Sequence, residues 1–474
     1  MTKLNEDWLA VWLGLLIFLL ALCAAAGTDV LGWAVSTSVW THLSTALGPV
    51  AKSWAGSPGW TYLVATLGFV TLVVTAGVRL LGVRPVRFAL PFLTVVSLSY
   101  LAWIAGSWAW VAATPDKRKA LGVAWSLNLT AEAGFIIALA LGLIIGNFFP
   151  RVAATLKEAI RPELYVKTGI VILGAFLGIT ATEQLGLATT VMFRGLCAIV
   201  EAYLIYWAVV YWVARRYFGF SREWAAPLAS GISICGVSAA IATGAAIKAR
   251  PVVPIMVSSL VVVFAVMELM FLPFLAQTFL WREPMVAGAW MGLAVKTDGA
   301  AVASGAIAES LIRARAAAEG INYSPGWIVG ATTTVKVFID VFIGIWSFVL
   351  AWIWSTKIEP GRDRAGAIHI WERFPKFVFG YLFTFAVVMT MGLGWPAIVP
   401  KLKASVAEAN IFRGIFFVMT FFTIGVVSNF RKLWEAGIAR LAAVYVLCLF
   451  GFIIWVGLLI SWLFFAGVKP PLAH

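Results

Sequence analysis

The sequence predicts an all-α polytopic membrane protein with about 13 transmembrane helices. Its residues are 62% hydrophobic and only 12% charged, whereas a soluble domain typically has about 25% charged residues. Apolar runs close to the roughly 20 residues that a spanning helix requires recur along the whole chain. The 24 Trp and 33 Phe residues fit lipid as the solvent, because indole rings favour the headgroup boundary.

The apolar runs divide the chain into an extension and a core. Three runs precede the charged residues 115–119, and ten follow them. We therefore expect a three-helix membrane extension at 1–115 that packs outside the core and contributes nothing to its site, a first core repeat at 129–280 and a second at 284–467. The expected spans are 8–26, 60–80, 88–113, 129–149, 165–183, 192–214, 226–247, 252–280, 286–308, 326–355, 377–399, 412–430 and 441–467.

Basic side chains predict the orientation of the chain. With thirteen crossings, the side of the N-terminus collects more Lys and Arg than the other side, so the positive-inside rule predicts a cytoplasmic N-terminus in the cell inner membrane. On this assignment Arg222 and Arg282 share the N-terminal side, and Lys248 and Arg250 lie opposite. The formal net charge of +14 is scattered over many loops, which argues against nucleic acid as a partner. The expected partner of the protein surface is the lipid bilayer.

Two segments of the core repeat one pattern. Residues 239–245 and 300–306 are Ala-rich runs at a constant offset of 61 (300 − 239), and each follows a polar, glycine-containing interruption. Similar small-residue composition is the simpler explanation, but paired interrupted helices are typical of transporter binding sites. We expect non-helical backbone at 233–236 and 297–299, close together near the middle of the membrane.

The first interruption carries small polar residues in the middle of an expected span, namely Ser233, Cys235, Gly236 and Ser238. If the helix unwinds there, the N–H groups that begin the next stretch are free and carry partial positive charge. Such a helix start binds anions without a buried cation. The alternative is a face of small residues on which two helices pack closely. We take these four residues as candidate substrate ligands.

The second interruption places two ionisable groups between apolar runs, in the sequence Lys296, Thr297, Asp298, Gly299. Charge at the centre of a membrane helix costs at least about 2.5 kcal/mol per group, so such groups face a cavity, pair with each other or titrate. The alternative is a loop at the membrane edge. A re-entrant hairpin would still place the pair near a cavity, so we take these four residues as candidate substrate ligands as well.

Thr333 and Lys336 are further candidate substrate ligands, in a polar stretch of the span 326–355 that also contains Asp340. Lys336 and Asp340 lie four residues apart on one helix face, where they can simply neutralise each other. The alternative is that the Lys336 ammonium faces the cavity and attracts an anion while Asp340 holds the ammonium in place. Asp298 and Asp340 are the candidates for a charge pair or for coupling to a proton or sodium ion.

Cysteine and histidine spacing gives no sign of a metal or another cofactor. The four Cys and three His residues are isolated from one another, without ligand spacing. We find no nucleophile–base pattern and no paired acidic motif. We therefore expect no catalytic residue, no metal, no cofactor and no enzymatic activity.

Several of these residues resemble a known family. The stretches 231–236, 296–305, 377–381 and 421–437, together with Lys336, are similar to the YeiH family of sulfate exporters, over residues 129–467. The resemblance implies a ten-helix core of two five-helix inverted repeats with two broken or re-entrant helices. It also implies a small inorganic or organosulfur anion as the substrate. Thr297 and Asp298 stand where the family has His-Glu, and the extension is additional.

Three functions are compatible with these observations. The first is a secondary transporter of a sulfate-like or organosulfur anion, with a site at two broken helices. The second is a cation/proton antiporter that uses Asp298 or Asp340 as the carrier carboxylate. A membrane-embedded enzyme is the third, and it lacks a recognisable catalytic motif. The oligomeric state is left open, a homo-oligomer included.

Overall fold

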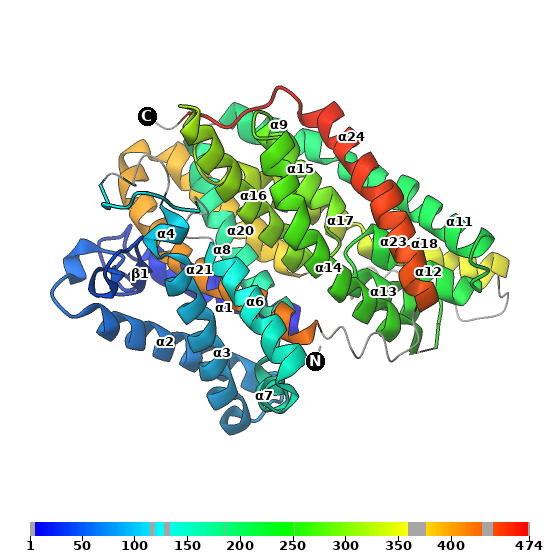
Figure 1. Cartoon of the computed structure of the whole chain (residues 1–474), viewed down its shortest axis with the longest axis horizontal. Coiled ribbons are helices and arrows are strands. Elements are labelled where there is room, and N and C mark those ends of the chain that lie inside the picture. Colours follow the sequence, from blue (N-terminus) through cyan, green and yellow to red (C-terminus); the bar gives the residue numbers. More distant parts are fainter. Residues whose placement is uncertain are drawn as a thin grey trace.

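A computed structural model describes residues 5–113, 118, 120–127, 133–183, 185–250, 252–358, 376–428 and 439–472 of the chain. The chain forms an elongated bundle of helices (Figure 1). The α-helices are α1 (Glu6–Leu22), α2 (Gly59–Arg79), α3 (Pro85–Gly106), α4 (Ala109–Ala112), α6 (Ala133–Phe148), α7 (Pro150–Leu156), α8 (Pro162–Glu183), α9 (Leu185–Gly195), α10 (Cys197–Val200), α11 (Trp207–Arg216), α12 (Arg222–Ser233), α13 (Val237–Ala246), α14 (Val252–Phe279), α15 (Pro284–Ala294), α16 (Asp298–Ala318), α17 (Trp327–Val341), α18 (Ile343–Ile353), α20 (Phe377–Gly394), α21 (Val399–Val427), α23 (Ala439–Cys448) and α24 (Ile454–Phe465).

Shorter elements interrupt and connect these helices. Two short strands, β1 (Val35–Thr37) and β2 (Leu47–Pro49), pair antiparallel in the connection between α1 and α2. The short 3₁₀ helices are η1 (Leu43–Thr45), η2 (Lys52–Trp54), η3 (Lys157–Ala159) and η6 (Pro396–Ile398). Three short π-helices, η4 (Glu201–Tyr206), η5 (Trp354–Ile358) and η7 (Leu449–Ile453), continue α10, α18 and α23.

The predicted fold class, an all-α polytopic membrane protein, is confirmed. In the described part of the chain, nine helices are long and apolar enough to cross a membrane, or up to ten if the bent pair α6 and α7–η3 is one span. The expected number was thirteen. Part of the difference lies at 226–247 and 286–308, where each expected span consists of two helices separated by a break of three residues.

The helices α12 and α13 fold back on each other as a re-entrant hairpin, hairpin 1 (222–246). The Thr243 hydroxyl donates to the Ser230 hydroxyl at 2.7 Å, and further from the turn the Arg250 backbone N–H donates to Glu223 at 2.7 Å. These partners lie at similar distances on either side of residues 234–236, as an antiparallel pair requires. The chain therefore enters and leaves this region at the same end of the bundle.

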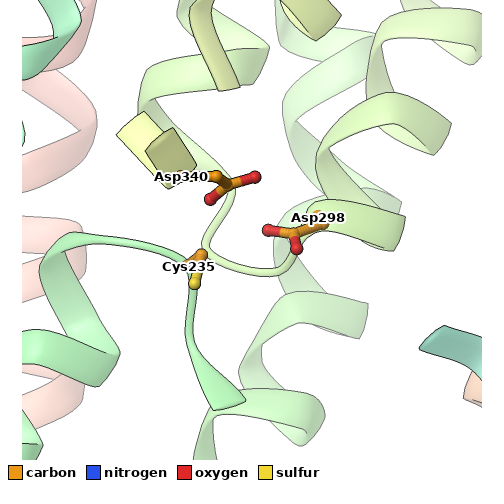
Figure 2. Close-up of side chains that lie close together, drawn as sticks. All are labelled: Cys235, Asp298 and Asp340. Carbon is orange, nitrogen blue, oxygen red and sulfur yellow. The ribbon is translucent and has the colours of Figure 1, made fainter. Parts of the chain in front are cut away.

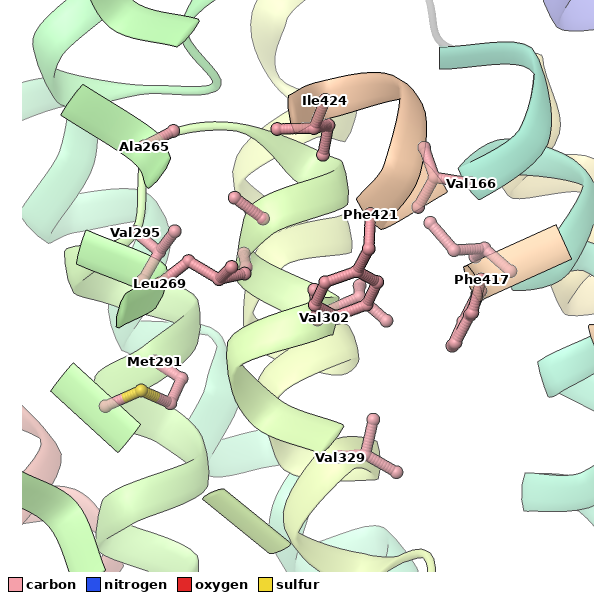
Figure 3. Close-up of a cluster of buried hydrophobic side chains, with 14 of the residues drawn as sticks. Val166, Ala265, Leu269, Met291, Val295, Val302, Val329, Phe417, Phe421 and Ile424 are labelled. Carbon is pink, nitrogen blue, oxygen red and sulfur yellow. The ribbon is translucent and has the colours of Figure 1, made fainter. Parts of the chain in front are cut away.

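The helices α15 and α16 form a second re-entrant hairpin, hairpin 2 (284–318). The Thr332 hydroxyl of α17 donates to the backbone oxygen of Gly288 at 2.7 Å, and Gly305 on the opposite arm packs against the same side chain. At the base, the Arg315 guanidinium lies 5.6 Å from the centre of the Trp281 ring. Apolar side chains of both arms pack on α8, α14, α17 and α21, as Figure 3 shows with Met291, Val302 and Phe421 among others.

The two hairpins enter from opposite ends and meet at their tips. Helix α14 joins their bases, and its 28 residues span about 42 Å, at 1.5 Å per residue. At the tips, a Cβ added to Gly236 would lie 2.7 Å from the backbone oxygen of Lys296. Opposed entry agrees with the expected inverted repeats. Hairpin 1 is the fourth expected span of 129–280, whereas hairpin 2 is the first expected span of 284–467. The hairpins therefore do not occupy equivalent positions in repeats with these boundaries, and the boundaries stay a prediction.

The hairpins correct the expected sides of several basic residues. Hairpin 1 returns Lys248 and Arg250 to the end that holds Arg222. Arg282, at the base of hairpin 2, belongs to the opposite end. The C-terminal residues lie at that second end as well, because the Gly467 N–H donates to Glu283 at 2.8 Å. We call the two ends the hairpin 1 side and the hairpin 2 side.

Helix α1 belongs to the bundle, although the whole of 1–115 was expected to pack outside the core. Gly14 packs directly on Val171 of α8, and Asp7 forms an ion pair with Lys167 at 2.9 Å. Leu9 and Ile17 are both 1% exposed. Helices α2 and α3 lie along the edge of the bundle, on the lower left of Figure 1. The extension is therefore peripheral only in part.

The hairpin topology predicts which cysteines a membrane-impermeant maleimide reaches. Single replacements Arg222→Cys, Arg250→Cys and Arg282→Cys are made in a background in which the four cysteines are serine. We expect the reagent to label positions 222 and 250 from one side of the membrane and position 282 from the other. Labelling of position 250 together with 282 would show that α12 and α13 cross as one continuous span.

Candidate functional site

The backbone leaves the helical conformation at two places that touch each other. The first break is at 234–236, so three of the four residues expected at 233–236 are confirmed and Ser233 is the last helical residue. The second is at 295–297, and the expectation of 297–299 was wrong for Asp298 and Gly299, which begin α16. The reason is Thr297, whose hydroxyl accepts from the Ala300 N–H at 3.2 Å and caps the helix.

Gly236 allows the tips to meet. Its φ of 71° lies in the left-handed region, which glycine adopts without a steric penalty. A Cβ at this position would lie 2.5 Å from a methyl carbon of Val261 and 2.7 Å from the Lys296 backbone oxygen. Both the conformation and the close approach therefore require glycine here.

Lys336 of α17 holds the two tips together. Its ammonium donates to the backbone oxygen of Ile234 at 2.8 Å and to that of Val295 at 3.4 Å. These carbonyls lie just beyond the C-terminal ends of α12 and α15, where helical partners are missing and partial negative charge accumulates. Lys336 is 2% exposed. In this structure backbone carbonyls hold the ammonium, and the expectation that it faces a substrate cavity stays a prediction.

Three side chains from separate elements gather beside this lysine. One potential metal-ligand atom of each of Cys235, Asp298 and Asp340, the thiol sulfur or a carboxylate oxygen, lies within 4.8 Å of the other two (Figure 2). The Lys336 ammonium is 4.0 Å from Asp298. Both carboxylate oxygens of Asp340 and one of Asp298 are buried and lack a hydrogen-bond partner in the described structure. A buried carboxylate without a donor is costly, so these groups need a proton or a cation.

Lys296 points into a different charged cluster. Its ammonium donates to the backbone oxygen of Leu293 and lies 4.5 Å from the centre of the Tyr206 ring. Its backbone N–H donates to Glu268 at 2.9 Å, and Tyr445 donates to the same carboxyl group at 3.3 Å. Glu268 was not among the residues expected at the site. Its position in the middle of the 252–280 span was the signal that could have found it.

The remaining candidates are distributed around the tips. Ser233 is fully buried and its hydroxyl has no partner in the described structure. Thr333 is buried, and its hydroxyl donates to Val329 within α17 at 2.8 Å, as in an ordinary helix. Gly299 and Thr297 line a small cavity of about 30 Å³ together with Glu163. The side chain of Ser238 lies outside the described residues.

The charges at the tips do not sum to an excess of cations. Two lysines, Lys296 and Lys336, are buried in the two clusters together with the carboxyl groups of Glu268, Asp298 and Asp340. A fourth buried carboxyl group, that of Glu201, lies close enough to Lys296 to attract it. If all are ionised the sum is −2 (2 − 4). The arrangement can therefore take up a proton or a metal cation, and positive charge for an anion comes from helix starts at the tips. Cys235, Asp298 and Asp340 could hold a cation, a grouping that sequence spacing does not reveal.

We expect Gly236→Ala to destabilise the protein because it adds a left-handed alanine and a steric clash. The loss should be at least about 2 kcal/mol, measured by thermal unfolding in detergent. Gly68→Ala on α2 is the matched control, because a Cβ there meets nothing within 4 Å. An unchanged unfolding temperature for Gly236→Ala would contradict the described contact between the tips.

Lys336→Met should destabilise the protein by about 3 kcal/mol or more, since removal of one partner leaves buried charge uncompensated. Adding Asp298→Asn should restore part of that loss, because it removes one of the stranded carboxylates. Thermal unfolding of the single and double variants checks both statements. Equal stability of Lys336→Met and the parent protein would show that the ammonium does not hold the tips together.

Comparison with known proteins identifies relatives over most of the chain. The family described as Conserved hypothetical protein 698 matches residues 120–444. A UPF0324 membrane protein of Nitrosomonas europaea is 40% identical over 476 residues, which covers 98% of this chain and 97% of that protein. An uncharacterized protein of Archaeoglobus fulgidus is 45% identical over 171 residues, 31% of this chain and 91% of its own length.

A UPF0324 membrane protein of Rhodopirellula baltica is 30% identical over 305 residues, 62% of this chain and 51% of its own length. No solved structure matches the chain. The family match begins after the extension, and the relative from Nitrosomonas europaea covers the extension too. The resemblance to the YeiH family is thereby confirmed, and the chain belongs to the UPF0324 family of membrane proteins.

Proposed function

We propose that this protein is a secondary transporter that carries a small anion, such as sulfate or an organosulfur anion, and couples its movement to a proton or a sodium ion. The observation that carries the proposal is the meeting of two re-entrant hairpins, tip to tip, around buried charge. Non-helical backbone deep in a membrane is tolerated where it is buried in protein or lines a cavity. Each hairpin can then act as the gate on its own side of the substrate.

Helix starts at both tips supply the attraction for an anion. Helix α13 begins directly after Gly236, and α16 begins after Thr297. The first N–H groups of a helix lack helical partners and carry partial positive charge. The small cavity beside Thr297 and Gly299 lies at one of these starts. An anion that separates the tips would meet both helix starts together with the Lys336 ammonium.

The carboxylates beside Lys336 supply the coupling. With Asp298, Asp340 and Lys336 all ionised, this cluster carries a charge of −1 (1 − 2). One proton or one sodium ion neutralises it, which supports a single coupling ion per cycle. Since the cluster contacts both tips, its charge and the packing of the hairpins depend on each other. Coupling requires such a dependence between ion binding and conformation.

A cation/proton antiporter is the second candidate. Four carboxyl groups against two lysines at the tips favour it, because the negative excess attracts cations. The two candidates differ in whether an anion crosses the membrane at all. In either case the cell inner membrane is the proposed location. The hairpin 1 side would be cytoplasmic, because Lys248 and Arg250 join Arg215, Arg216 and Arg222 there. We also keep the cytoplasmic N-terminus that the sequence predicts.

Counterflow in proteoliposomes tests the proposal. Vesicles loaded with unlabelled sulfate, sulfite or taurine are given the same labelled anion outside, with sodium and pH gradients varied separately. We expect uptake of at least one of these anions by the parent protein and a loss of at least about tenfold in gradient-driven uptake by Asp340→Asn, because the variant cannot release a proton or bind sodium at this position. Glu319→Gln, in an exposed loop, is the control.

The outcomes separate the two candidates. Proton or sodium exchange without uptake of any of the three anions supports the antiporter and overturns the anion proposal. Gradient-driven uptake by Asp340→Asn equal to that of the parent protein removes this carboxylate from the coupling site.

A further inference from the structure

A polar chamber separate from the hairpin tips lies on the hairpin 2 side. Its volume is about 320 Å³, at the lower end of the range found for small-molecule sites. Core helices contribute Glu309, Arg313 and Arg413, and the N-terminal extension contributes Thr37, Tyr100 and Trp103. The extension was expected to contribute nothing to the substrate site of the core, and this chamber is a different place in the structure. At this chamber it forms a wall.

The extension is firmly held where it meets the chamber. The hydroxyl groups of Thr37 and Tyr100 are 2.7 Å apart and share a hydrogen bond between β1 and α3. The Trp40 indole donates to the Ile104 backbone oxygen at 2.8 Å. This wall is therefore a packed structure, joined to the core through α3 and α6.

The charges that line the chamber favour an anion. Glu309 is occupied as an acceptor, because its carboxylate accepts from the N–H groups of Gly326, Ile328 and Val329 at 2.7, 2.9 and 3.1 Å and so caps the start of α17. Among the described residues that line the chamber, the guanidinium groups of Arg313 and Arg413 carry positive charge and Glu309 carries negative charge. Guanidinium groups bind sulfonate-like and carboxylate groups through several N–H donors at once.

Aromatic rings surround one of these guanidinium groups. The Arg413 guanidinium carbon is 5.4 Å from the ring centres of both Phe176 and Phe417, and its Nε donates to Asn410 at 2.5 Å. Phe135 and Trp103 also line the chamber. An inorganic anion such as sulfate needs none of these rings. A compact organic anion places its charged group on arginine and its apolar body against the rings.

We propose that this chamber binds a compact organic anion, one with a sulfonate or carboxylate group and an aromatic or similarly flat apolar body. The site is distinct from the hairpin tips and does not rest on the proposed transport function. It assigns a role to the extension, which completes a binding site that the core helices leave open on one face. A ligand in the chamber would contact the extension, hairpin 2 and α21 at once.

Titration calorimetry with benzenesulfonate on the full chain in detergent tests the proposal. We expect binding to the parent protein, tighter than that of inorganic sulfate. Gly414→Phe should abolish it, because Gly414 lines the chamber and a side chain there meets nothing within 4 Å, so the ring occupies the space. Gly68→Phe on α2 is the matched control, since a Cβ there also meets nothing within 4 Å. It should bind as the parent does.

A second pair of variants tests the charge. Arg413→Gln should weaken benzenesulfonate binding about tenfold or more, while Lys401→Gln, an exposed position on the same helix, should leave it unchanged. Asp340→Asn should bind benzenesulfonate normally, which separates the chamber from the tips. Absence of binding to the parent, or equal binding to Gly414→Phe, would overturn the proposal. Equal affinity for sulfate and benzenesulfonate would overturn the claim that the ligand has an organic body.

Discussion

The bond from Lys336 to the two hairpin tips is the interaction on which the centre of this protein depends. The chain reverses twice inside the membrane, and each reversal leaves backbone carbonyls without helical partners. Unsatisfied backbone groups cost several kcal/mol each in hydrocarbon. One ammonium satisfies a carbonyl from each tip, at 2.8 and 3.4 Å. Gly236 then lets the tips approach closely enough for a single side chain to reach both.

This arrangement sets the charge of the surroundings. A buried ammonium needs compensation, and Asp298 supplies it at 4.0 Å. Asp340 adds a second carboxylate that the same lysine cannot fully balance, and its oxygens have no hydrogen-bond partner in the described structure. The remaining negative charge makes the packing of the tips sensitive to a proton or cation. If the tips separate, the lysine loses both carbonyls, so the proposed gate and the proposed coupling site share one side chain.

The hairpins also explain how the extension relates to the core. Helix α1 packs on α8 through Gly14 and Val171, whereas β1 and α3 reach the chamber on the hairpin 2 side. The tips and the chamber use different chemistry. Helix starts, one lysine and paired carboxylates suit small ions, whereas arginines among aromatic rings suit a larger organic anion. The two proposed sites therefore differ in the class of ligand they would bind and in their depth in the bundle.

The sequence by itself determined the membrane class, the apolar segments and the places where two helices break, because hydrophobic length and runs of small polar residues act locally. It also identified Lys336, Asp298 and Asp340, since charge in an apolar segment is conspicuous. Only the tertiary structure decided that the breaks are reversals. A broken segment has the same composition whether the next helix continues or turns back, and packing on α14 and α17 selects the direction. Long-range packing likewise turned Lys296 toward Tyr206 and brought Cys235, Asp298 and Asp340 together from three distant segments.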